Sequence, residues 1–165
     1  YVRRCSESVK AFYEAGHDIA NHSDNHPHPN SLSEEKLISD TEKCSGEIKK
    51  LGIEEKKLYR APYGEYNDKT VKIINNMGYK FIQWDADSLD YTGIAVSDIT
   101  ERVVSKVGCG SIVLFHTGVE NTAEALEQVL FKLKGDGYSF KKVDELILKQ
   151  DYQIDHAGRQ IKNKL

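Results

Sequence analysis

The chain has 165 residues, of which 39% are hydrophobic and 30% charged, a composition typical of a globular domain with a substantial core. A formal net charge of −3 gives no reason to expect a nucleic-acid partner, because such partners are held by positive charge. No apolar run approaches the roughly 20 residues of a membrane-spanning helix, and three scattered cysteines form neither a disulfide framework nor a CxxC metal site.

Apolar residues at helical spacing predict three helices in the first half of the chain, near residues 9–16, 31–52 and 71–78. The second helix is the clearest, since Ser31 and Glu34 have the spacing of a capping box and Gly52 stands just past the end. Cys44 lies on its apolar stripe and is expected to be a small core residue. Extended segments are expected between the helices, at residues 17–21, 58–60 and 79–84.

The second half continues the alternation. Ser97 is expected to cap a helix that runs through Val107. Residues 111–115 form the strongest predicted strand, a short apolar run that follows a glycine-rich turn. A long helix, an extended piece and a short helix are expected to follow, at residues 123–133, 138–141 and 143–148.

This alternation with short connections predicts an α/β fold with a mainly parallel sheet. A barrel and an open sheet both fit the pattern. We expect one domain over residues 1–149 and a polar tail or wrapping arm over residues 150–165. In either architecture, reactive groups should gather at the C-terminal ends of the strands.

Reactive side chains do follow four of the predicted strands. The segments concerned are His22-Ser23-Asp24-Asn25-His26, Arg60-Ala61-Pro62-Tyr63-Gly64, the stretch 85–91 and His116-Thr117-Gly118. This coincidence is the main argument from the residues themselves for an enzyme.

His22 and His26 stand four residues apart, so a single turn or tight loop could direct both imidazoles to one point. Two imidazoles are a good start for Zn²⁺ or a similar divalent ion, which usually takes a third protein ligand and keeps a position open for water. A polar loop that happens to contain histidines is the simpler interpretation of this motif alone. His28, between two prolines, is expected to be exposed rather than ligating.

Four motifs occur in a fixed order: His22-Ser23-x-x-His26, Arg60-x-Pro62-Tyr63-Gly64, Asp87-x-x-Asp90 and Leu114-x-His116. In that order they resemble the second to fifth motifs of the polysaccharide deacetylase family, the NodB-homology domains of carbohydrate esterase family 4. The resemblance extends from about the first residue to Leu148. It implies a distorted (β/α) barrel in which an Asp and two His hold a divalent metal, usually zinc. That metal activates the water that attacks an N-acetyl carbonyl.

The resemblance implies that His22 and His26 are the histidine ligands. The backbone N–H of Tyr63 would stabilise the developing oxyanion, and Arg60 would orient and electrostatically tune the catalytic aspartate. Taken singly, Arg60 would be interpreted as a member of a surface ion pair.

The same resemblance implies that His116 is the general acid that protonates the leaving amine, with Asp90 holding and charging it. A carboxylate beside an imidazole favours the protonated form that this task needs. Taken singly, Asp90 would be interpreted as a helix or turn cap. Three residues would contact the substrate: Leu114 at the acetyl methyl group, Tyr91 as an aromatic wall, and Pro62.

Two departures from the family pattern stand out. Asp90 is followed by Tyr91 where the family has Trp, which we interpret as a change in substrate fit. The first family motif, Thr-Phe-Asp-Asp-Gly, which supplies the third ligand and the catalytic base, is absent, and none of four other acids clearly replaces it: Asp18, Asp24, Asp85 and Asp87. We expect that pair to come from a segment before Tyr1 or from another chain, and we expect the gap in the sheet to favour self-association.

The leading hypothesis is metal-dependent hydrolysis of N-acetyl or O-acetyl groups on an acetylated polysaccharide such as peptidoglycan or a chitin-like glycan. The piece by itself could be inactive. The expected location of the complete protein is extracytoplasmic or at the cell wall, although the chain carries no targeting signal. The alternative is a catalytically inactive, carbohydrate-binding relative. A peptide-cleaving metalloprotein is disfavoured, because no HExxH helix is present.

Overall fold

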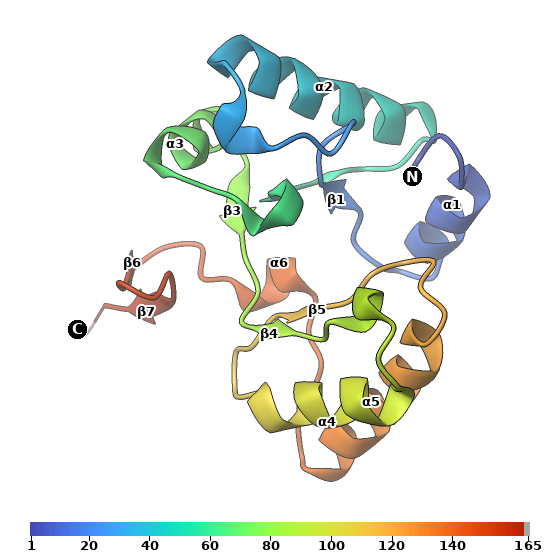
Figure 1. Ribbon diagram of the computed structural model, residues 1–165. Helices are drawn as coiled ribbons and strands as arrows, with labels where there is room; N and C mark the ends of the chain where they lie inside the picture. Colours follow the sequence, from blue (N-terminus) through green and yellow to red (C-terminus); the bar gives the residue numbers. More distant parts are fainter. Residues whose placement is uncertain (164–165) are drawn as a thin grey trace. The chain divides into compact units, whose positions relative to one another are not determined.

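The computed structural model describes residues 1–163. The chain forms two compact units, Tyr1–Gln83 (unit 1) and Trp84–Leu165 (unit 2). The predicted alternation of helices with mainly parallel strands is confirmed in both units (Figure 1). Within residues 1–163, no helix is both long enough and apolar enough to cross a bilayer.

Unit 1 contains three parallel strands in the order β1-β2-β3, with helices between them (Figure 1). Its elements are α1 (Ser6–Glu14), β1 (Ala20–Asn21), η1 (Pro29–Ser31), α2 (Glu34–Lys50), β2 (Lys56–Arg60), η2 (Pro62–Gly64), α3 (Asp68–Asn76) and β3 (Lys80–Ile82). All three helices and all three extended segments predicted for this half are therefore present. The strands β1 and β3 are shorter than expected, and β2 begins two residues earlier than expected.

The capping residue predicted for the second helix is wrong. Ser31 does not cap it, because Ser31 belongs to the 3₁₀ turn that begins at Pro29, and its hydroxyl donates to the carbonyl of His28 at 2.8 Å. The N-cap of α2 is Ser33, whose Oγ accepts the N–H of Lys36 at 3.4 Å. The proline ring pre-sets the turn, so the helix can begin only after it.

The core of unit 1 consists of two apolar clusters, and α2 contributes buried residues to both. One contains Leu37, Tyr59, Ala61, Ile73, Ile74 and Tyr79, and the other contains Val9, Cys44, Ile48 and Ile53. Each fully buried aliphatic side chain contributes about 1.5–3 kcal/mol relative to an exposed one. The prediction that Cys44 is a core residue is confirmed, and burial raises the pKa of its thiol to about 11.

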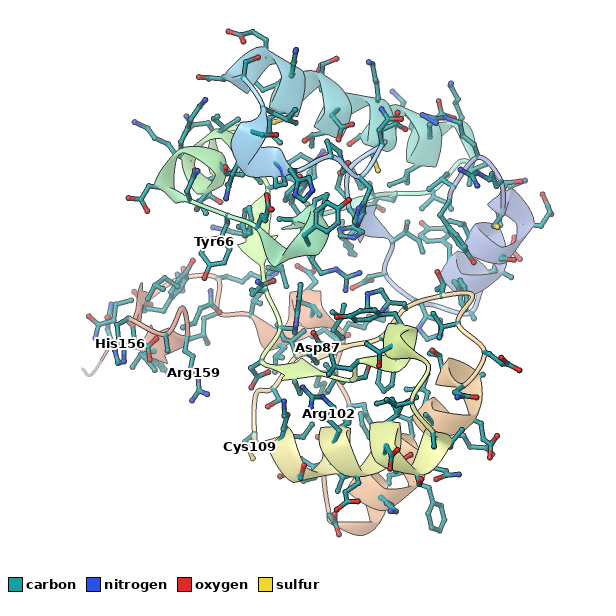
Figure 2. All side chains as sticks on the ribbon, viewed as in Figure 1. Tyr66, Asp87, Arg102, Cys109, His156 and Arg159 are labelled. Atoms are coloured by element: carbon teal, nitrogen blue, oxygen red, sulfur yellow. The ribbon has the colours of Figure 1, made fainter. Side chains whose placement is uncertain are left out.

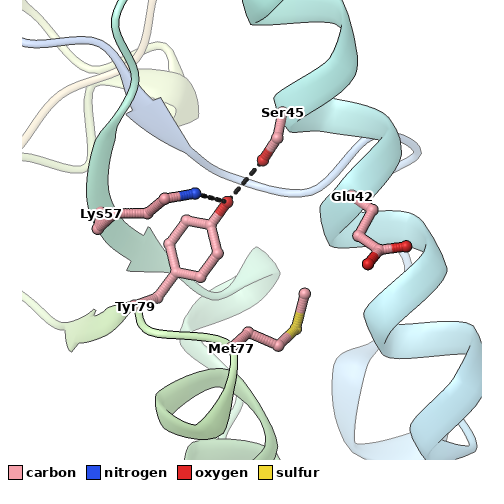
Figure 3. Close-up of a pocket in the computed structure, with 5 residues that line it drawn as sticks. All are labelled: Glu42, Ser45, Lys57, Met77 and Tyr79. Atoms are coloured by element: carbon pink, nitrogen blue, oxygen red, sulfur yellow. Dashed lines mark hydrogen bonds between the residues drawn. The ribbon is translucent and has the colours of Figure 1, made fainter.

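A polar network also connects α2 to the strands of unit 1. The hydroxyl of Tyr79 lies 2.6 Å from Ser45 Oγ and 3.2 Å from Lys57 Nζ (Figure 3). It also donates to Glu55 Oε2 at 2.9 Å. Glu55 Oε1 in turn accepts Asn21 Nδ2 at 2.9 Å. A shallow pocket of about 280 Å³ lies beside the network, lined by Glu42, Ser45, Lys57, Met77 and Tyr79. The network thereby fixes Asn21, the last residue of β1.

Unit 2 contains a two-stranded parallel sheet, β4-β5, and two helices, α4 and α5, that pack side by side (Figure 1). Its elements are β4 (Ala86–Asp87), η3 (Asp90–Thr92), α4 (Val96–Lys106), β5 (Val113–Leu114), α5 (Thr122–Gly135), α6 (Val143–Leu146), β6 (Tyr152–Ile154) and β7 (Gln160–Lys162). Val103, Val129 and Leu133 form the buried contact. Arg102 fastens α4 to β4, since its Nε donates to the carbonyl of Asp87 at 2.9 Å (Figure 2).

The cap predicted for α4 is wrong. The N-cap is Ala95, in extended conformation, and its carbonyl accepts the N–H groups of Asp98 and Ile99. Ser97 lies inside the helix. The N-cap of this helix therefore has no capping side chain. A prediction that looks only for capping residue types cannot locate such a helix start.

The C-terminal part differs from expectation in two places. Residues 138–141 form no strand, whereas the predicted polar tail contains the antiparallel hairpin β6-β7. The hairpin pairs Tyr152 with Lys162 and Ile154 with Gln160. The boundary proposed between residues 1–149 and 150–165 stays a prediction, and the last two residues of that tail, 164 and 165, lie outside the described residues.

Candidate functional site

In each unit, the predicted functional residues stand at the C-terminal ends of parallel strands. In unit 1, His22 directly follows β1 and Tyr63 lies in η2 after β2. In unit 2, His116 comes two residues after β5. Asp90 lies in η3 after β4, a strand that we did not predict separately from β3. The expectation that strand ends carry the reactive groups is therefore confirmed within each unit.

His22 and His26 lie close together, as the motif predicted. Their ring centroids are 5.0 Å apart, with an angle of 80° between the planes. His22 Nδ1 lies 2.6 Å from the backbone carbonyl of Arg60. Because a carbonyl can only accept, Nδ1 carries the proton, and in the neutral ring the lone pair is on Nε2. A backbone carbonyl that fixes the tautomer in this way is typical of histidines that bind metals.

The backbone is strained where the motifs lie. Among residues 1–163, five residues other than glycine have a positive φ: Ser23 (70°), His26 (54°), Tyr63 (58°), Leu89 (54°) and Asp151 (57°). All but Asp151 lie in or beside a predicted motif. Such conformations cost about 1–3 kcal/mol each and persist only where the surroundings impose them. The motif loops are therefore held in shapes that they would not adopt alone.

Tyr63 presents its side chain beside the histidines. The ring is 58% exposed, stacks on His28 with centroids 4.1 Å apart and 10° between the planes, and meets His26 edge-on at 4.6 Å. His28 Nδ1 lies 2.7 Å from Glu65 Oε1. His28 is exposed, as predicted. Its stacking on Tyr63 and its contact with Glu65 were not predicted, because no local pattern links these residues.

Arg60 forms no surface ion pair with any residue of the described range 1–163. The residue is half-buried, burial lowers the pKa of its guanidinium, and no carboxylate among residues 1–163 offsets that effect. The group stays charged at neutral pH all the same, since an arginine titrates far above it. The interpretation of Arg60 as a partner of a catalytic aspartate stays a prediction.

In unit 2, the buried carboxylate of Asp90 pairs with the partly exposed ring of His116. Asp90 is 0% exposed. Its Oδ1 lies 2.7 Å from His116 Nδ1, and its Oδ2 accepts the backbone N–H of His116 at 2.7 Å and the Thr122 hydroxyl at 2.6 Å. With Nδ1 bound to the carboxylate, Nε2 is the atom through which His116 can transfer a proton.

The electrostatics of Asp90 favour its charged form. Burial on its own would raise the pKa of the carboxyl, but the hydrogen bonds from Thr122 and from the backbone and ring of His116, together with the charge of that ring, outweigh burial and lower the pKa. Asp90 therefore binds the ring and backbone of His116 and the hydroxyl of Thr122, and does not act merely as a turn cap. Thr122, the first residue of α5, was missed, because no motif links it to Asp90.

The residues expected to contact substrate differ in exposure. Tyr91 is exposed, and its ring meets His116 edge-on at 4.9 Å, which suits an aromatic wall. Leu114 is 4% exposed within β5, and Pro62 is buried. Contact of these three residues with substrate stays a prediction.

The two histidines fit a metal as a pair. The two imidazoles lie close together, and the tautomer of His22 leaves its Nε2 able to bind a metal. Within the described part of the chain, however, no three His, Cys, Asp or Glu side chains converge on one point. Asp24, between the histidines, is paired with Arg3, and Asp85 accepts from Ser111 Oγ and the N–H of Ile112. Both acids therefore have partners of their own, and the expectation that no acid of this chain replaces the missing ligand stays a prediction.

Comparison with known proteins identifies the family. The model of the family described as polysaccharide deacetylase matches residues 1–82. A peptidoglycan-N-acetylglucosamine deacetylase of Bacillus cereus is 34% identical over 151 residues, which are 88% of this chain and 70% of that protein. The chain belongs to the polysaccharide deacetylase family.

Solved structures support the same assignment. A CE4 family pseudoenzyme from Bacillus anthracis has a TM-score of 0.83 and 28% identity, with 88% of this chain and 51% of that chain covered. The Bc1960 peptidoglycan N-acetylglucosamine deacetylase has a TM-score of 0.83 and 26% identity, with 88% and 70% covered. The predicted α/β fold of the polysaccharide deacetylase type is thus confirmed. The chain spans 59%, 70% and 46% of the lengths of three curated relatives that it matches.

Proposed function

We propose that this deacetylase-family chain takes part in the metal-dependent hydrolysis of acetyl groups, above all N-acetyl groups, on a polysaccharide such as peptidoglycan. The observation that carries the proposal is the Asp90–His116 pair, with 2.7 Å between Oδ1 and Nδ1 and a wholly buried carboxylate. Binding a sugar does not need a histidine whose ring is held by a buried carboxylate. Protonation of an amine leaving group does need such a positioned proton donor.

His22 and His26 in unit 1 would hold the metal, with a third ligand from outside residues 1–163. When bound, a divalent ion such as Zn²⁺ supplies Lewis acidity and lowers the pKa of a coordinated water. The backbone N–H of Tyr63 would donate to the oxyanion as it develops, and the positive φ of 58° sets the direction of that peptide. The half-buried Arg60 would bind and orient the carboxylate that acts as base.

In unit 2, His116 would give the proton on Nε2 to the leaving nitrogen. Asp90 would keep the ring in one tautomer and stabilise its positive charge during that transfer. Tyr91, exposed beside His116, would form part of the wall that the sugar contacts. Leu114, in the same unit, would contact the acetyl methyl group. In unit 1, Pro62 would contact the substrate. Action on a cell-wall glycan would place the complete protein outside the cytoplasm.

Acetate release tests the proposal. The purified protein is incubated with Zn²⁺ and an N-acetylglucosamine oligomer or with peptidoglycan, and free acetate is measured before and after a chelator is added. Zn²⁺-dependent release supports the proposal. Saturable binding of the oligomer without any release would contradict it.

A second candidate is a catalytically inactive, carbohydrate-binding relative. The pseudoenzyme among the structural neighbours and the lack of a third metal ligand among residues 1–163 favour it. It predicts that replacing Tyr63 or Tyr91 by Ala weakens oligomer binding, while replacing His116 by Ala changes nothing. The proposed hydrolysis predicts a loss of turnover in the His116 variant.

A further inference from the structure

The loop that joins the two histidines rests on a buried acid of α2. Asp40 is 7% exposed. Its Oδ2 accepts the backbone N–H of Asp24 at 3.1 Å, and its Oδ1 accepts the backbone N–H of Asn25 at 3.2 Å and the Asn25 side-chain amide at 3.4 Å. One carboxylate thus binds the two residues in the middle of the His22–His26 segment.

The remaining backbone N–H groups of this loop are satisfied nearby. Asn21, 1% exposed, accepts the N–H of Ser23 on its Oδ1 at 3.0 Å. Ser23 Oγ accepts the N–H of His26 at 2.9 Å. Asn21 itself is held through Nδ2, which donates to the carbonyl of Thr41 at 3.0 Å and to Ser45 Oγ at 3.0 Å. Every backbone N–H from Ser23 to His26 therefore has a side-chain acceptor.

These acceptors hold a conformation that the loop would not keep by itself. Ser23 and His26 have φ values of 70° and 54°, in the left-handed region that residues other than glycine avoid. Side chains that accept from consecutive backbone N–H groups are the usual way to stabilise such turns. The 5.0 Å separation of the two imidazoles depends on this backbone.

Asp40 has no comparable task in its own helix. It lies in the middle of α2, two turns from the N-cap, on the buried face that also contains Leu37, Cys44 and Ile48. An apolar side chain would suit that face, since a buried carboxylate is costly unless it is hydrogen-bonded. The hydrogen bonds that compensate for its burial all go to the histidine loop.

We propose that Asp40 is a positioning residue that holds His22 and His26 at the separation a shared metal needs. It lies outside the four motifs. The metal part of this inference rests on the proposed function, whereas the loop part does not. Residues that orient metal ligands from behind typically change affinity for the metal by about 10–100-fold when they are removed.

The test uses Asp40→Ala and Asp40→Asn in the purified protein. Amide hydrogen exchange of Asp24 and Asn25 is followed by NMR, and the dissociation constant for Zn²⁺ is measured by calorimetric titration. In Asp40→Ala we expect the protection of both amides to be lost and the dissociation constant to rise about 10–100-fold. Asp40→Asn, which keeps one acceptor, should fall between this variant and the wild type, and it carries the test if the Ala variant fails to fold.

Two control variants separate positioning from general effects. Leu37→Ala opens a cavity in the same helix and keeps the carboxylate, so it should lower the melting temperature without changing Zn²⁺ affinity. Glu42→Ala removes an exposed acid from the same helix and should change neither. As an additional readout, the visible absorption of bound Co²⁺ should change in Asp40→Ala and not in Leu37→Ala, because it reports the ligand geometry.

The outcomes distinguish this inference from the proposed function. Wild-type Zn²⁺ affinity in Asp40→Ala overturns the inference, as does retained protection of both amides. If the wild-type protein binds no Zn²⁺ and releases no acetate, the proposed function fails. In that case amide exchange alone decides whether Asp40 holds the loop.

Discussion

In unit 1, the groups expected to bind a metal are histidines whose loop is held by other side chains, above all Asp40 and Asn21. In unit 2, by contrast, the functional carboxylate is itself the acceptor that fastens the segment. Asp90 accepts from the ring and backbone of His116 and from Thr122, and no intermediary stands between them.

The difference determines how function and stability are related in each unit. In unit 1, a histidine can be replaced while the hydrogen bonds that shape its loop remain, so function should be lost with little loss of stability. In unit 2, replacing Asp90 removes the partner of the proposed general acid and leaves three donors without their acceptor. Function and stability should therefore be lost together.

The largest expected effect is on turnover. His116→Ala should lower acetate release about 10²–10⁴-fold, because it removes the group that we propose as general acid. It should leave Zn²⁺ affinity unchanged. His26→Ala should abolish Zn²⁺ binding instead. Enzyme assays and metal titrations check both, and His156→Ala, an exposed histidine of unit 2, is the control. Loss of Zn²⁺ binding in His116→Ala would contradict the assignment of metal binding to unit 1 and of proton transfer to unit 2.

The second effect is on stability. Asp90→Ala should lower the free energy of unfolding by about 1–3 kcal/mol or more, because buried donors lose their acceptor. His26→Ala should change it by much less. Urea denaturation measures both, with the exposed Asp136→Asn as the control in unit 2. Equal losses in Asp90→Ala and His26→Ala would contradict the comparison.

A smaller effect follows from the Thr122 hydroxyl. Thr122→Val keeps the shape but removes one donor to Asp90, so we expect a loss of about 1 kcal/mol at neutral pH and a rise in the pKa of Asp90. Because the folded pKa of Asp90 is lowered, its stabilising contribution is complete above the pKa of the unfolded state and is lost as the pH falls through the folded pKa.

The stability difference between Thr122→Val and the wild type should therefore narrow as the pH falls below the ordinary range of an aspartate. Denaturation at pH 7 and near pH 3 measures this. A difference that is the same at both pH values would show that the hydroxyl acts through packing rather than through the charge of Asp90.

The smallest effect on function is expected from the cysteines. Cys109 of unit 2 is exposed, whereas Cys44 of unit 1 is buried with a pKa of about 11. In a Cys5→Ser background, a thiol reagent at pH 8 should modify Cys109 quickly and Cys44 only after unfolding. Modified protein should keep its acetate release. Fast labelling of Cys44 would show that the core of unit 1 opens readily.

Much of the fold was predictable because it depends on local patterns. The apolar stripe of α2 and the apolar run at β5 were located from residue spacing. Helix starts were less predictable: Ser33 and Ala95 serve as N-caps in place of Ser31 and Ser97, since the chain just before each helix decides which residue can adopt the extended conformation.

The sequence by itself determined the family and the identity of the four motifs, because the residue types that hold a metal or move a proton are few and their order is specific. Only the tertiary structure showed that His22 bonds to the carbonyl of Arg60, that Thr122 completes the shell of Asp90, and that Asp40 holds the histidine loop. These partners are 38, 32 and 16 residues apart in the chain. Hydrogen bonds over such separations follow from the packing of helices on strands, which no local pattern encodes.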